Sequence, residues 1–370
     1  MATHLKKIKL TEVVFIPKSK IKKFFGEKDY IATSDIDINK ITGSERVTYE
    51  NRPSRAALLM TENDVLFAKM KNTVKVLTGS RDTEAKIFST GFYILRPKKD
   101  VVKEFLYFFF LTDYFNKQKN LFCTGATMSG LNNTGLRKIE IPIPVNDDGK
   151  PDLDEQARIV KTLKEIELLK EKRAEADKKM LDIIPAVYSK IIKGEKNIND
   201  KVPFSKIFNI TTGKLNANAA NLDGKYPFFT CSREDYKIDT YAFDCEALIL
   251  SGNNATADYS IKHHKGKFNA YQRTYILTLK NSSDSYYLFK FLLENQLQTL
   301  KKNSIGSNTK YLTLGILNKL KFFVPNPEEQ EQFTQIAKKV EAHKKEQERL
   351  KKEIARLYQS ALVRSFSGKL

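Results

Sequence analysis

An internal duplication constrains this chain more than any other feature of its sequence. Three apolar segments return 182 positions later in the same order: Val65–Lys69 as Ala247–Ser251, Phe92–Leu95 as Thr274–Leu277, and Phe105–Phe108 as Tyr287–Lys290. A chance match would not keep one offset across segments of such different composition. We therefore infer a tandem duplication, so the fold has to contain two versions of one architecture.

The match continues past these segments with small deletions. Gly125-Ala126-Thr127 corresponds to Gly306-Ser307-Asn308, Glu155-Gln156 to Glu329-Gln330, and Gly194 to Gly368. Between them, apolar residues and a proline keep the same correspondence: Leu131, Leu136, Ile139 and Pro144 fall on Leu312, Leu317, Leu320 and Pro325. Each copy therefore extends from a strand-rich segment to the end of a long helix.

Each copy divides into a mixed segment and a charged helix. The predicted domains are residues 1–147 (first mixed segment), 148–196 (first helix), 197–324 (second mixed segment) and 325–370 (second helix). β-branched and aromatic residues predict strands at Val65–Ala68 and Tyr275–Leu279. Length and aromatic content predict buried helices at Phe105–Tyr114 and Tyr287–Asn295. The sequence thus predicts an α+β protein with two tandem mixed α/β domains.

Both long helices, about Asp154–Lys193 and about Pro327–Ser367, carry an apolar seven-residue repeat. The first repeat is Ile159, Ile166, Arg173, Met180 and Val187, with Leu169, Ala176 and Ile183 as companions. The second is Phe333, Val340, Gln347, Ile354 and Ala361, with Ile336, His343, Leu350 and Leu357 as companions. Spacings of 3 and 4 are typical of a coiled coil. We predict an antiparallel, pseudo-two-fold symmetric pair; the alternative is two unrelated amphipathic helices, each lying on its own domain.

The helix ends and lengths add a geometric expectation. Gly194 and Gly368 follow the last periodic residues, where a C-terminal glycine cap belongs. A helix of about 40 residues is about 60 Å long. Because DNA half-sites recur about 34–36 Å apart, a rigid pair of this length could space two reading domains along a duplex.

Charge is the first indication of a partner. The 370 residues carry 64 Lys and Arg against 44 Asp and Glu, a formal net charge of +20. A protein this basic favours a polyanionic partner, and Lys and Arg release counterions when they bind phosphates. Double-stranded DNA or RNA is the leading candidate; the alternatives are solubility through charge or contact with anionic lipid.

Several other classes are disfavoured by the sequence. The longest apolar run, Phe105–Leu111, is too short to cross a bilayer, and the first residues lack the apolar stretch of a signal peptide. The three cysteines, Cys123, Cys231 and Cys245, include no C-x-x-C pair. We therefore expect neither a disulfide scaffold nor a zinc finger, and a cytoplasmic location.

Catalytic motifs are missing as well. The sequence has no G-x-x-x-x-G-K-[ST] and no G-x-G-x-x-G, and Ser251-Gly252 lacks the flanking residues of a G-x-S-x-G turn. Four histidines, with His263 and His264 adjacent, do not form a convincing metal site with dispersed cysteines. We expect a non-catalytic chain without its own metal or cofactor.

The duplicated motif order resembles the specificity subunit of type I restriction-modification systems. The residues that carry the resemblance are Gly125-Ala126-Thr127, Leu131, Ile141–Pro144, Glu155–Val160 and Gly194, repeated as Gly306-Ser307-Asn308, Leu312, Val324-Pro325, Glu329-Gln330 and Gly368. The second mixed segment opens with Phe204–Phe208 and Gly213, as is usual in the family. The first opens with Leu10–Val14 and has no matching glycine.

The resemblance implies a DNA reader without catalysis of its own. Two target-recognition domains would each read half of a bipartite, asymmetric site, separated by unread base pairs. The helix pair would act as the spacer and would dock two methyltransferase subunits, through which restriction subunits join. These partner subunits would use S-adenosylmethionine, ATP and magnesium.

Candidate DNA contacts follow the matched strands, where the two copies differ most. We expect loops at Lys69–Phe88 and Ser251–Phe268, and the basic run Ile261–Arg273 contains no acidic residue. Lys and Arg suit phosphates, whereas Asn, Gln and Arg bond base edges. The candidates are Lys69, Lys71, Arg81 and Lys86 in the first copy, and Asn253, Asn254, Lys262, His263, His264, Lys265, Lys267, Gln272 and Arg273 in the second. The plain alternative for each lysine is a solvated surface charge.

Two other function classes stay open at this stage. One is a basic coiled-coil scaffold that binds protein or membrane without reading sequence, for which scrambled duplexes would bind equally well. The other is a stand-alone nucleic-acid enzyme, for which the purified chain would be active with S-adenosylmethionine, or with ATP and magnesium.

Overall fold

The computed structural model describes residues 4–17, 21–125, 129–191, 201–221 and 223–368. The chain forms two compact units: unit 1 comprises residues 1–174 and 349–370, and unit 2 comprises residues 175–348. Each unit therefore contains one mixed segment together with parts of both long helices. The prediction of two tandem mixed α/β domains is confirmed at this level.

Unit 1 is built on two four-stranded sheets. One has the order β2 (Val14–Phe15), β11 (Phe92–Pro97), β8 (Val65–Ala68), β9 (Val76–Thr78); the other has the order β6 (Glu45–Val47), β3 (Lys28–Ile31), β10 (Ile87–Ser89), β7 (Ala56–Leu58). All four residues of β8 are buried, as expected for an apolar strand covered on both faces. The predicted strand Val65–Ala68 is confirmed.

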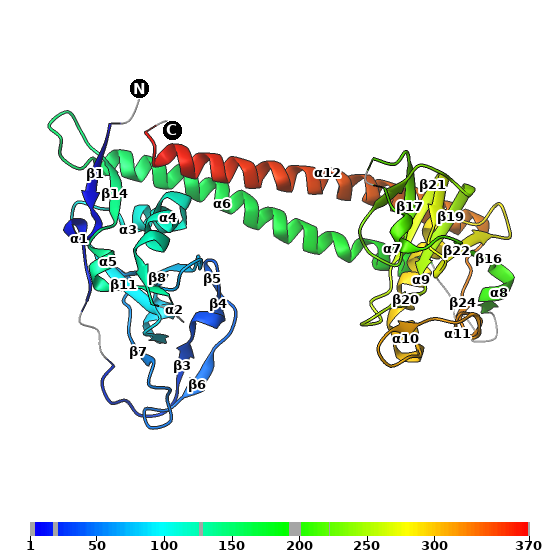
Figure 1. Ribbon diagram of the computed structural model, residues 1–370, viewed down its shortest axis with the longest axis horizontal. Helices are drawn as coiled ribbons and strands as arrows, with labels where there is room; N and C mark the ends of the chain where they lie inside the picture. Colours follow the sequence, from blue (N-terminus) through cyan, green and yellow to red (C-terminus); the bar gives the residue numbers. More distant parts are fainter. Residues whose placement is uncertain (1–3, 18–20, 126–128, 192–200, 222, 369–370) are drawn as a thin grey trace. The chain divides into compact units, whose positions relative to one another are not determined.

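Smaller elements of unit 1 surround these sheets (Figure 1). Three short strand pairs are β1 (Leu5–Lys9) with β14 (Glu140–Pro144), β4 (Ile36–Asp37) with β5 (Lys40–Ile41), and β12 (Cys123–Thr124) with β13 (Gly130–Leu131). The helical elements are α1 (Leu10–Val13), η1 (Thr33–Asp35), α2 (Arg81–Glu84), α3 (Lys103–Leu111), α4 (Asp113–Phe122) and α5 (Asn133–Leu136).

The predicted helix Phe105–Tyr114 is wrong at its end, because the chain turns at Thr112. Thr112 has extended backbone angles, and its side chain accepts a hydrogen bond from the N–H of Phe115, which caps α4. The aromatic residues nevertheless form the core: the Phe67 ring lies 4.8 Å from that of Phe110 and 5.0 Å from that of Phe115. Two short helices thus replace one and wrap the same apolar surface.

The C-terminal half of α4 holds the segment that follows β8. Lys119 is only 1% exposed, and its ammonium donates to the carbonyl oxygens of Ala68 and Thr73. The neighbouring Asn120 accepts from the N–H of Asn72, whose φ is +57°. Burial lowers the pKa of Lys119 to about 8. A buried amine therefore fixes the conformation of an otherwise exposed loop.

Unit 2 contains one six-stranded sheet. Its order is β16 (Phe208–Thr212), β22 (Thr274–Leu279), β19 (Phe243–Ser251), β21 (Ile261–Ala270), β17 (Tyr226–Phe229), β18 (Tyr236–Ile238). The other elements are β15 (Val202–Pro203) with β24 (Lys321–Phe322), β20 (Asn253–Asn254) with β23 (Lys310–Tyr311), α8 (Phe204–Ile207), η3 (Ala217–Ala219), α9 (Tyr286–Glu294), α10 (Leu297–Asn303) and α11 (Leu314–Leu317). The predicted strand Tyr275–Leu279 and helix Tyr287–Asn295 are confirmed within one residue.

The loop predicted at Ser251–Phe268 is wrong in its second half, because residues 261–268 belong to strand β21. Residues 261–268 of this strand pair antiparallel with β19, and its last two residues, Asn269 and Ala270, pair parallel with β17. The corresponding part of unit 1 is divided: β9 pairs antiparallel with β8, β10 pairs parallel with β3, and α2 lies between them. The predicted loop Lys69–Phe88 is therefore also partly ordered as strand and helix.

Equivalent hydrogen bonds in the two units bear out the duplication. The N–H of Leu10 donates to the carbonyl of Ile139 (2.9 Å), and the N–H of Phe204 donates to that of Leu320 (3.0 Å). The first mixed segment thus opens as the second does, although it lacks a glycine at the position of Gly213. At Gly213 a Cβ would lie 2.0 Å from the carbonyl oxygen of Ala270, so the close approach is specific to unit 2.

A buried glutamine ties each long helix to its mixed segment. The side-chain oxygen of Gln156 accepts from the N–H of Val102, and that of Gln330 accepts from the N–H of Ser285, both at 2.9 Å. These bonds align the starts of α3 and α9 at an offset of 183. The predicted match of Phe105 with Tyr287 is therefore wrong by one residue, and Phe105 corresponds to Leu288.

The first long helix is interrupted, contrary to the single helix predicted at 154–193. It consists of α6 (Leu153–Leu181) and α7 (Ile183–Ile191), whereas α12 (Pro327–Ser365) is continuous. Pro185 has no N–H to donate to the carbonyl of Leu181, and its ring crowds that carbonyl, so the helix breaks there. Gly194 lies outside the described residues; Gly368 has φ +72°, the left-handed conformation expected of a C-terminal cap.

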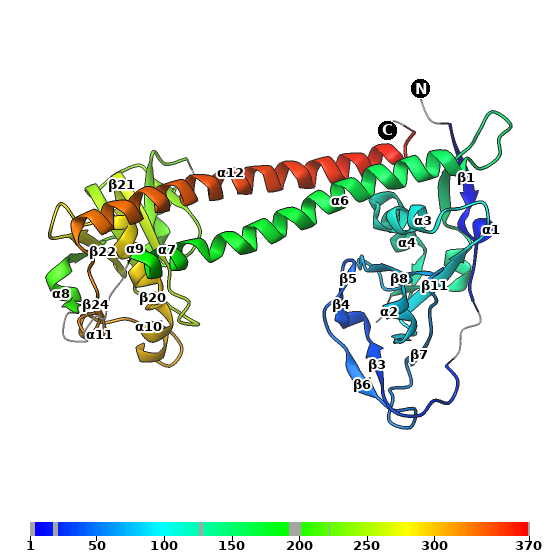
Figure 2. The same cartoon turned by 180° about the vertical axis from the view of Figure 1, so that it is seen from behind.

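The buried stripe of the helices in unit 1 also differs from the predicted heptad. Ile159, Ile166 and Ala361 are buried as expected, but the companions Leu169 and Leu357 are 51% and 52% exposed. Val160, Leu163, Tyr358, Leu362 and Phe366 are buried instead. The helices pack against α3 as well as each other, which moves the buried stripe, and Figures 1 and 2 show the first half of α6 beside α3 and α4.

A polar triad lies inside that packing. The phenols of Tyr107 and Tyr358 both donate to the same carboxylate oxygen of Glu167, at 3.0 and 2.9 Å, and Asn39 donates to the Tyr107 oxygen. Burial raises the pKa of both phenols, so they remain protonated donors. The triad joins α3, α6 and α12 within unit 1.

We expect Gln156→Leu and Gln330→Leu each to lower the free energy of unfolding by about 1–3 kcal/mol, because each leaves buried polar groups unpaired. The two glutamines lie in different units, so their effects should add in the double variant. Denaturant unfolding measures this, with the exposed Gln335→Leu as the control. Equal stability of Gln335→Leu and Gln156→Leu would contradict the assigned role.

The buried amine predicts a pH effect. Between about pH 8 and the ordinary lysine range the unfolded chain binds the proton that folded Lys119 has lost, so stability from this site rises with pH. From about pH 7 to about pH 9.5 the wild type should gain about 2 kcal/mol relative to Lys119→Met. Lys117→Met, on the exposed face of α4, should follow the wild-type pH dependence.

Candidate nucleic-acid interface

In each unit the segment after the matched strand lies against a short hairpin. In unit 1 the N–H of Leu131 donates to the carbonyl of Lys69 (2.9 Å). In unit 2, β20 pairs with β23, and the N–H of Leu312 donates to the carbonyl of Gly252 (2.8 Å). The two copies therefore present the same composite surface, made of one loop and one hairpin.

In each hairpin the matched glycine directly follows the first paired segment: Gly125 follows β12, and Gly306 follows Ile305, which bridges to Tyr311. Gly125 has φ +117° and Gly306 has φ +107°, a conformation that favours glycine. At Gly306 an added Cβ would lie 2.1 Å from the carbonyl oxygen of Thr309. Ala126 and Thr127 lie outside the described residues. The positive φ at this position therefore explains why both copies of the repeated motif have a glycine there.

The first-copy candidates differ in their freedom to contact a ligand. Lys71 and Arg81 are exposed. Lys69 is partly buried: its ammonium donates to the carbonyl of Thr90 (2.8 Å), lies 4.4 Å from the Tyr93 ring centre, and has a pKa lowered by burial. Lys86 pairs with Asp82 at 2.7 Å. Lys71 and Arg81 are therefore the freer cations of this set.

The second-copy amides and Arg273 lie on neighbouring turns. The side-chain oxygen of Asn254 accepts from the N–H groups of Thr256 and Asp258 and from the Thr256 hydroxyl, so it orders its own turn. Asn253 is partly exposed. Gln272 donates to the side chain of Asn216 (3.0 Å), and Arg273 is exposed. Asn253 and Arg273 are better placed than Asn254 for an intermolecular contact.

Strand geometry divides the basic run of β21 between two faces of the sheet. Residues paired across an antiparallel ladder share a face, and successive residues alternate. His263 and Lys265 pair with Leu248 and Glu246, so they share one face with Lys267. Lys262 and His264, opposite Ile249 and Ala247, lie on the other. The run therefore does not form one continuous basic patch.

The face with His263 is neutralised locally. Glu246 lies 2.9 Å from Nε2 of His263 and 3.2 Å from the ammonium of Lys265. Burial opposes ionisation of Glu246, but the hydrogen bonds from these two residues outweigh it and lower its pKa. Lys267 extends over the Tyr241 ring (4.5 Å), and this phenol raises its pKa. Lys265 and Lys267 retain exposed ammonium groups.

The opposite face bears a basic and aromatic cavity of about 640 Å³, which we call the β17–β21 cavity. Lys262 pairs there with Asp235 (2.9 Å). The His264 ring lies 5.3 Å from both Phe229 and Phe268, and its buried Nε2 has no hydrogen-bond partner among the described residues. The cavity is lined by Lys225, Tyr226, Pro227, Phe229, Arg233, Asp235, Tyr236, Lys237, Lys262, His263 and His264.

Sequence reasoning missed several residues of that cavity. Lys225 precedes Tyr226 at the start of β17, Lys237 follows Tyr236 in β18, and Arg233 lies in the segment between these strands. Basic residues next to tyrosines are typical of nucleic-acid-binding surfaces, and this signal is visible in the sequence. Arg233 pairs with Asp258 (2.7 Å), which links the cavity to the turn ordered by Asn254. The sequence does not reveal the strand pairing that places β18 beside β17, and β17 beside β21.

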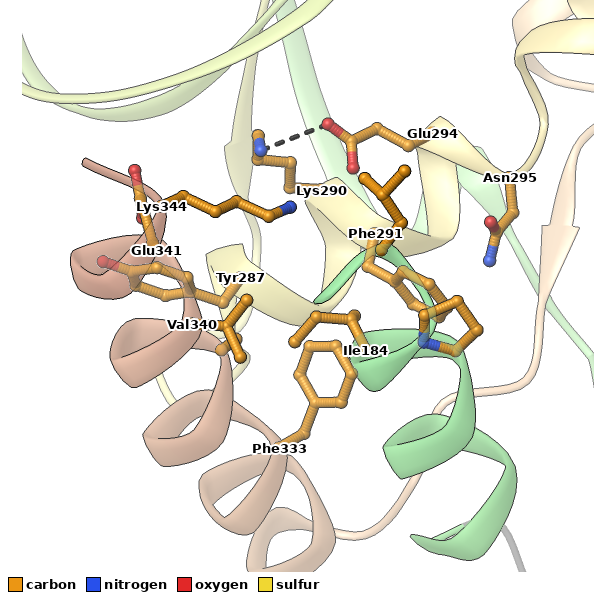
Figure 3. Close-up of a pocket in the computed structure, with 13 residues that line it drawn as sticks. Ile184, Tyr287, Lys290, Phe291, Glu294, Asn295, Phe333, Val340, Glu341 and Lys344 are labelled. Carbon is orange, nitrogen blue, oxygen red and sulfur yellow. Dashed lines mark ion pairs between the residues drawn. The ribbon is translucent and has the colours of Figure 1, made fainter. Parts of the chain in front are cut away.

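Unit 2 also has an apolar groove between α7, α9 and α12, shown in Figure 3. Its floor is made by Ile184, Phe291, Phe333 and Val340, and its volume is about 240 Å³. Lys290 and Glu294 form an ion pair (3.1 Å) at its rim. The helix alignment set by the buried glutamines relates Lys290 to Tyr107, which in unit 1 belongs to the tyrosine–glutamate triad.

Neither a metal site nor a membrane-spanning helix emerges from the residues that the structure describes. Within those ranges no three His, Cys, Asp or Glu side chains gather closely enough to hold a metal ion. No described helix combines the length and the apolar character needed to cross a membrane.

Three comparisons with known proteins place this architecture. Residues 4–178 and 199–356 each match the family described as type I restriction modification DNA specificity domain. Over 174 residues the chain is 34% identical to the type I restriction enzyme EcoDI specificity subunit of Escherichia coli. That match covers 46% of this chain and 38% of the relative, so the chain spans less than half the relative's length.

Solved structures show the same fold at low identity. A chain from a structure concerned with complex assembly and conformational transition of the type I R-M system has a TM-score of 0.63 at 19% identity, covering 99% of this chain and 98% of that one. The S subunit of a type I restriction-modification system from M. genitalium gives 0.63 at 14% identity, covering 98% and 96%. With both copies matched, the chain belongs to the family of type I restriction-modification DNA specificity domains.

Proposed function

We propose that this chain is the DNA-reading specificity subunit of a type I restriction-modification complex and is itself non-catalytic. Each unit reads one half of a bipartite, asymmetric site in double-stranded DNA. The observation that carries the proposal is the repeated loop-and-hairpin surface on a shared frame. Both copies use the same strand and a hairpin in which the matched glycine follows the first paired segment, but the segment beside them is β9–α2–β10 in one copy and β21 in the other.

The charge and the exposed side chains support this role. A net charge of +20 favours the phosphate backbone, which supplies affinity without sequence information. Lys71 and Arg81 in unit 1, and Lys265 and Lys267 in unit 2, are the proposed phosphate contacts. Asn253 and Arg273 are the proposed base contacts, because amide and guanidinium groups pair with base edges. The remaining candidates contribute to the proposed interface or stabilise its conformation through contacts within the protein: Lys69, Lys86, Asn254, Lys262, His263, His264 and Gln272.

The long helices are proposed to be spacer and docking surface. Antiparallel pairing of α6–α7 with α12 about a pseudo-two-fold axis would fix the distance between the units. Exposed Leu169 and Leu357 give this pair apolar surface for two methyltransferase subunits, through which restriction subunits would join. The partner subunits would bring S-adenosylmethionine, ATP and magnesium. The competing proposal, a basic scaffold without sequence reading, requires equal affinity for scrambled duplexes.

The proposed phosphate contacts predict a salt effect. Arg81→Gln and Lys71→Gln, in the complex with methyltransferase partners, should weaken binding to all duplexes alike. Each should reduce the slope of log affinity against log salt by about 1, because one counterion fewer is released. Lys99→Gln, an exposed cation on another part of unit 1, should keep the wild-type slope. Unchanged slopes for both test variants would contradict these contacts.

The spacer role predicts a change in the DNA site itself. One heptad added to α6 and one to α12 lengthen the pair by about 10 Å, which corresponds to about 3 base pairs. Mapping of methylated adenines in cells should then show both half-sites unchanged, with more unread base pairs between them. Altered half-sites, or an unaltered spacing in an active complex, would contradict the proposed spacer role of the helix pair.

A further inference from the structure

One side chain of unit 1 is exposed to a degree that its type rarely permits. Phe25, between β2 and β3, is 93% exposed, the largest value among the exposed large apolar side chains described. The next residue, Gly26, has φ +74°, which turns the chain back toward β3. A phenylalanine at such a turn leaves apolar surface in water, and burying that surface against a partner would be favourable.

The neighbours of Phe25 are anchored, so its exposure is not that of a loose loop. Phe24 packs edge-on against Tyr49, with ring centres 5.8 Å apart. The N–H of Ile21 donates to the carbonyl of Ala57 (3.2 Å). Ile21 and Phe24 both pack on the cluster that contains Tyr30. The segment is therefore anchored immediately before the outward-pointing ring, and β3 begins at Lys28, three residues after it.

The surroundings of that ring are basic. Lys22 and Lys23 are exposed, and no ion pair joins either to an acidic side chain within residues 4–17, 21–125 and the other described ranges. The nearest acids in sequence, Glu27 and Asp29, both pair with Arg46, at 3.3 and 3.6 Å. Two uncompensated ammonium groups thus precede the exposed ring.

A lone aromatic ring beside free lysines matches the chemistry of duplex DNA. Apolar side chains wedge between base steps while neighbouring cations hold the phosphates. A protein partner would favour a contiguous apolar patch, but the exposed neighbours of Phe25 in sequence are Lys22, Lys23, Gly26 and Glu27. Figures 1 and 2 show the segment leading into β3 at the end of unit 1 away from α6.

We propose that Phe25 is a wedge that inserts between two base pairs in the half-site read by unit 1, with Lys22 and Lys23 on the adjacent phosphates. The inference rests on the proposed DNA-reading function and deepens it. The corresponding segment of unit 2, Gly213–Lys225, contains no aromatic residue. The distortion is therefore confined to one half-site, and unit 1 gains selectivity for steps that unstack easily.

The test uses the chain assembled with its methyltransferase partners on a duplex bearing its mapped site, with 2-aminopurine placed at successive positions. In the wild type, fluorescence should rise at one step of one half-site, reporting unstacking. Phe25→Ala should abolish that rise and weaken binding about tenfold with an unchanged salt slope. Phe25→Leu should keep the rise, whereas Lys22→Gln and Lys23→Gln should reduce the salt slope.

The control is Leu121→Ala, which truncates another strongly exposed apolar residue of unit 1 and should bind and fluoresce as wild type. Thermal unfolding of Phe25→Ala should match the wild type, since the ring is not buried. If Phe25→Ala kept wild-type fluorescence and affinity, the wedge would be refuted but not the proposed function. The same holds if Phe25→Ala bound DNA as the wild type does and lost only binding to vesicles that contain anionic lipid. Failure of the wild-type complex to prefer its site over a scrambled duplex would instead overturn the proposed function.

Discussion

The apolar surface that each mixed segment shares with the long helices supports the rest of the structure. In unit 1 the ring of Phe366, at the end of α12, lies 4.8 Å from Phe105 and 5.7 Å from Phe109 of α3. Ile159 and Leu163 of α6 belong to the same buried cluster. The core of the mixed segment is therefore completed by residues more than two hundred positions away in sequence. Folding of each unit and packing of its helix segments are one event, since neither apolar surface is covered without the other.

The two units solve this packing with different side chains. Unit 1 closes the junction of α3, α6 and α12 with two tyrosines on one glutamate, whereas unit 2 has Lys290 and Ile184 beside an apolar groove. The frame tolerates such exchange because backbone contacts and the buried glutamines, not the side chains at the junction, set the alignment. The same tolerance explains how the surface segments diverged into β9–α2–β10 and β21. A duplicated reader needs this combination of a fixed frame and a variable surface.

Local pattern predicted part of the fold and misled in other parts. Apolar runs predict strands β8 and β22, and periodic apolar residues predict helix α12. In each case the pattern of apolar residues matches the surface that the element buries. Strand β21 was not predicted, because its lysines and histidines resemble a loop until β19 provides the hydrogen bonds of an antiparallel ladder. Pro185 is visible in the sequence as a residue that interrupts helices, although the seven-residue repeat continues across it. The sequence could indicate which residue types would contact DNA. Only the structure shows that the side chains of Lys69 and Asn254 already have hydrogen-bond partners within the protein.

The sequence by itself determined the duplication, the basic charge, the alternation of mixed segment and long helix, and the family. These are properties of residue order, and they hold whatever the chain packs against. Tertiary structure alone decided that the basic run divides between two faces of a sheet, that α3 and α9 align at 183 positions and not 182, and that Phe25 points into solvent beside an anchored Phe24. Each of these depends on which strand or helix becomes a neighbour, and burial and hydrogen bonding between distant segments select that neighbour.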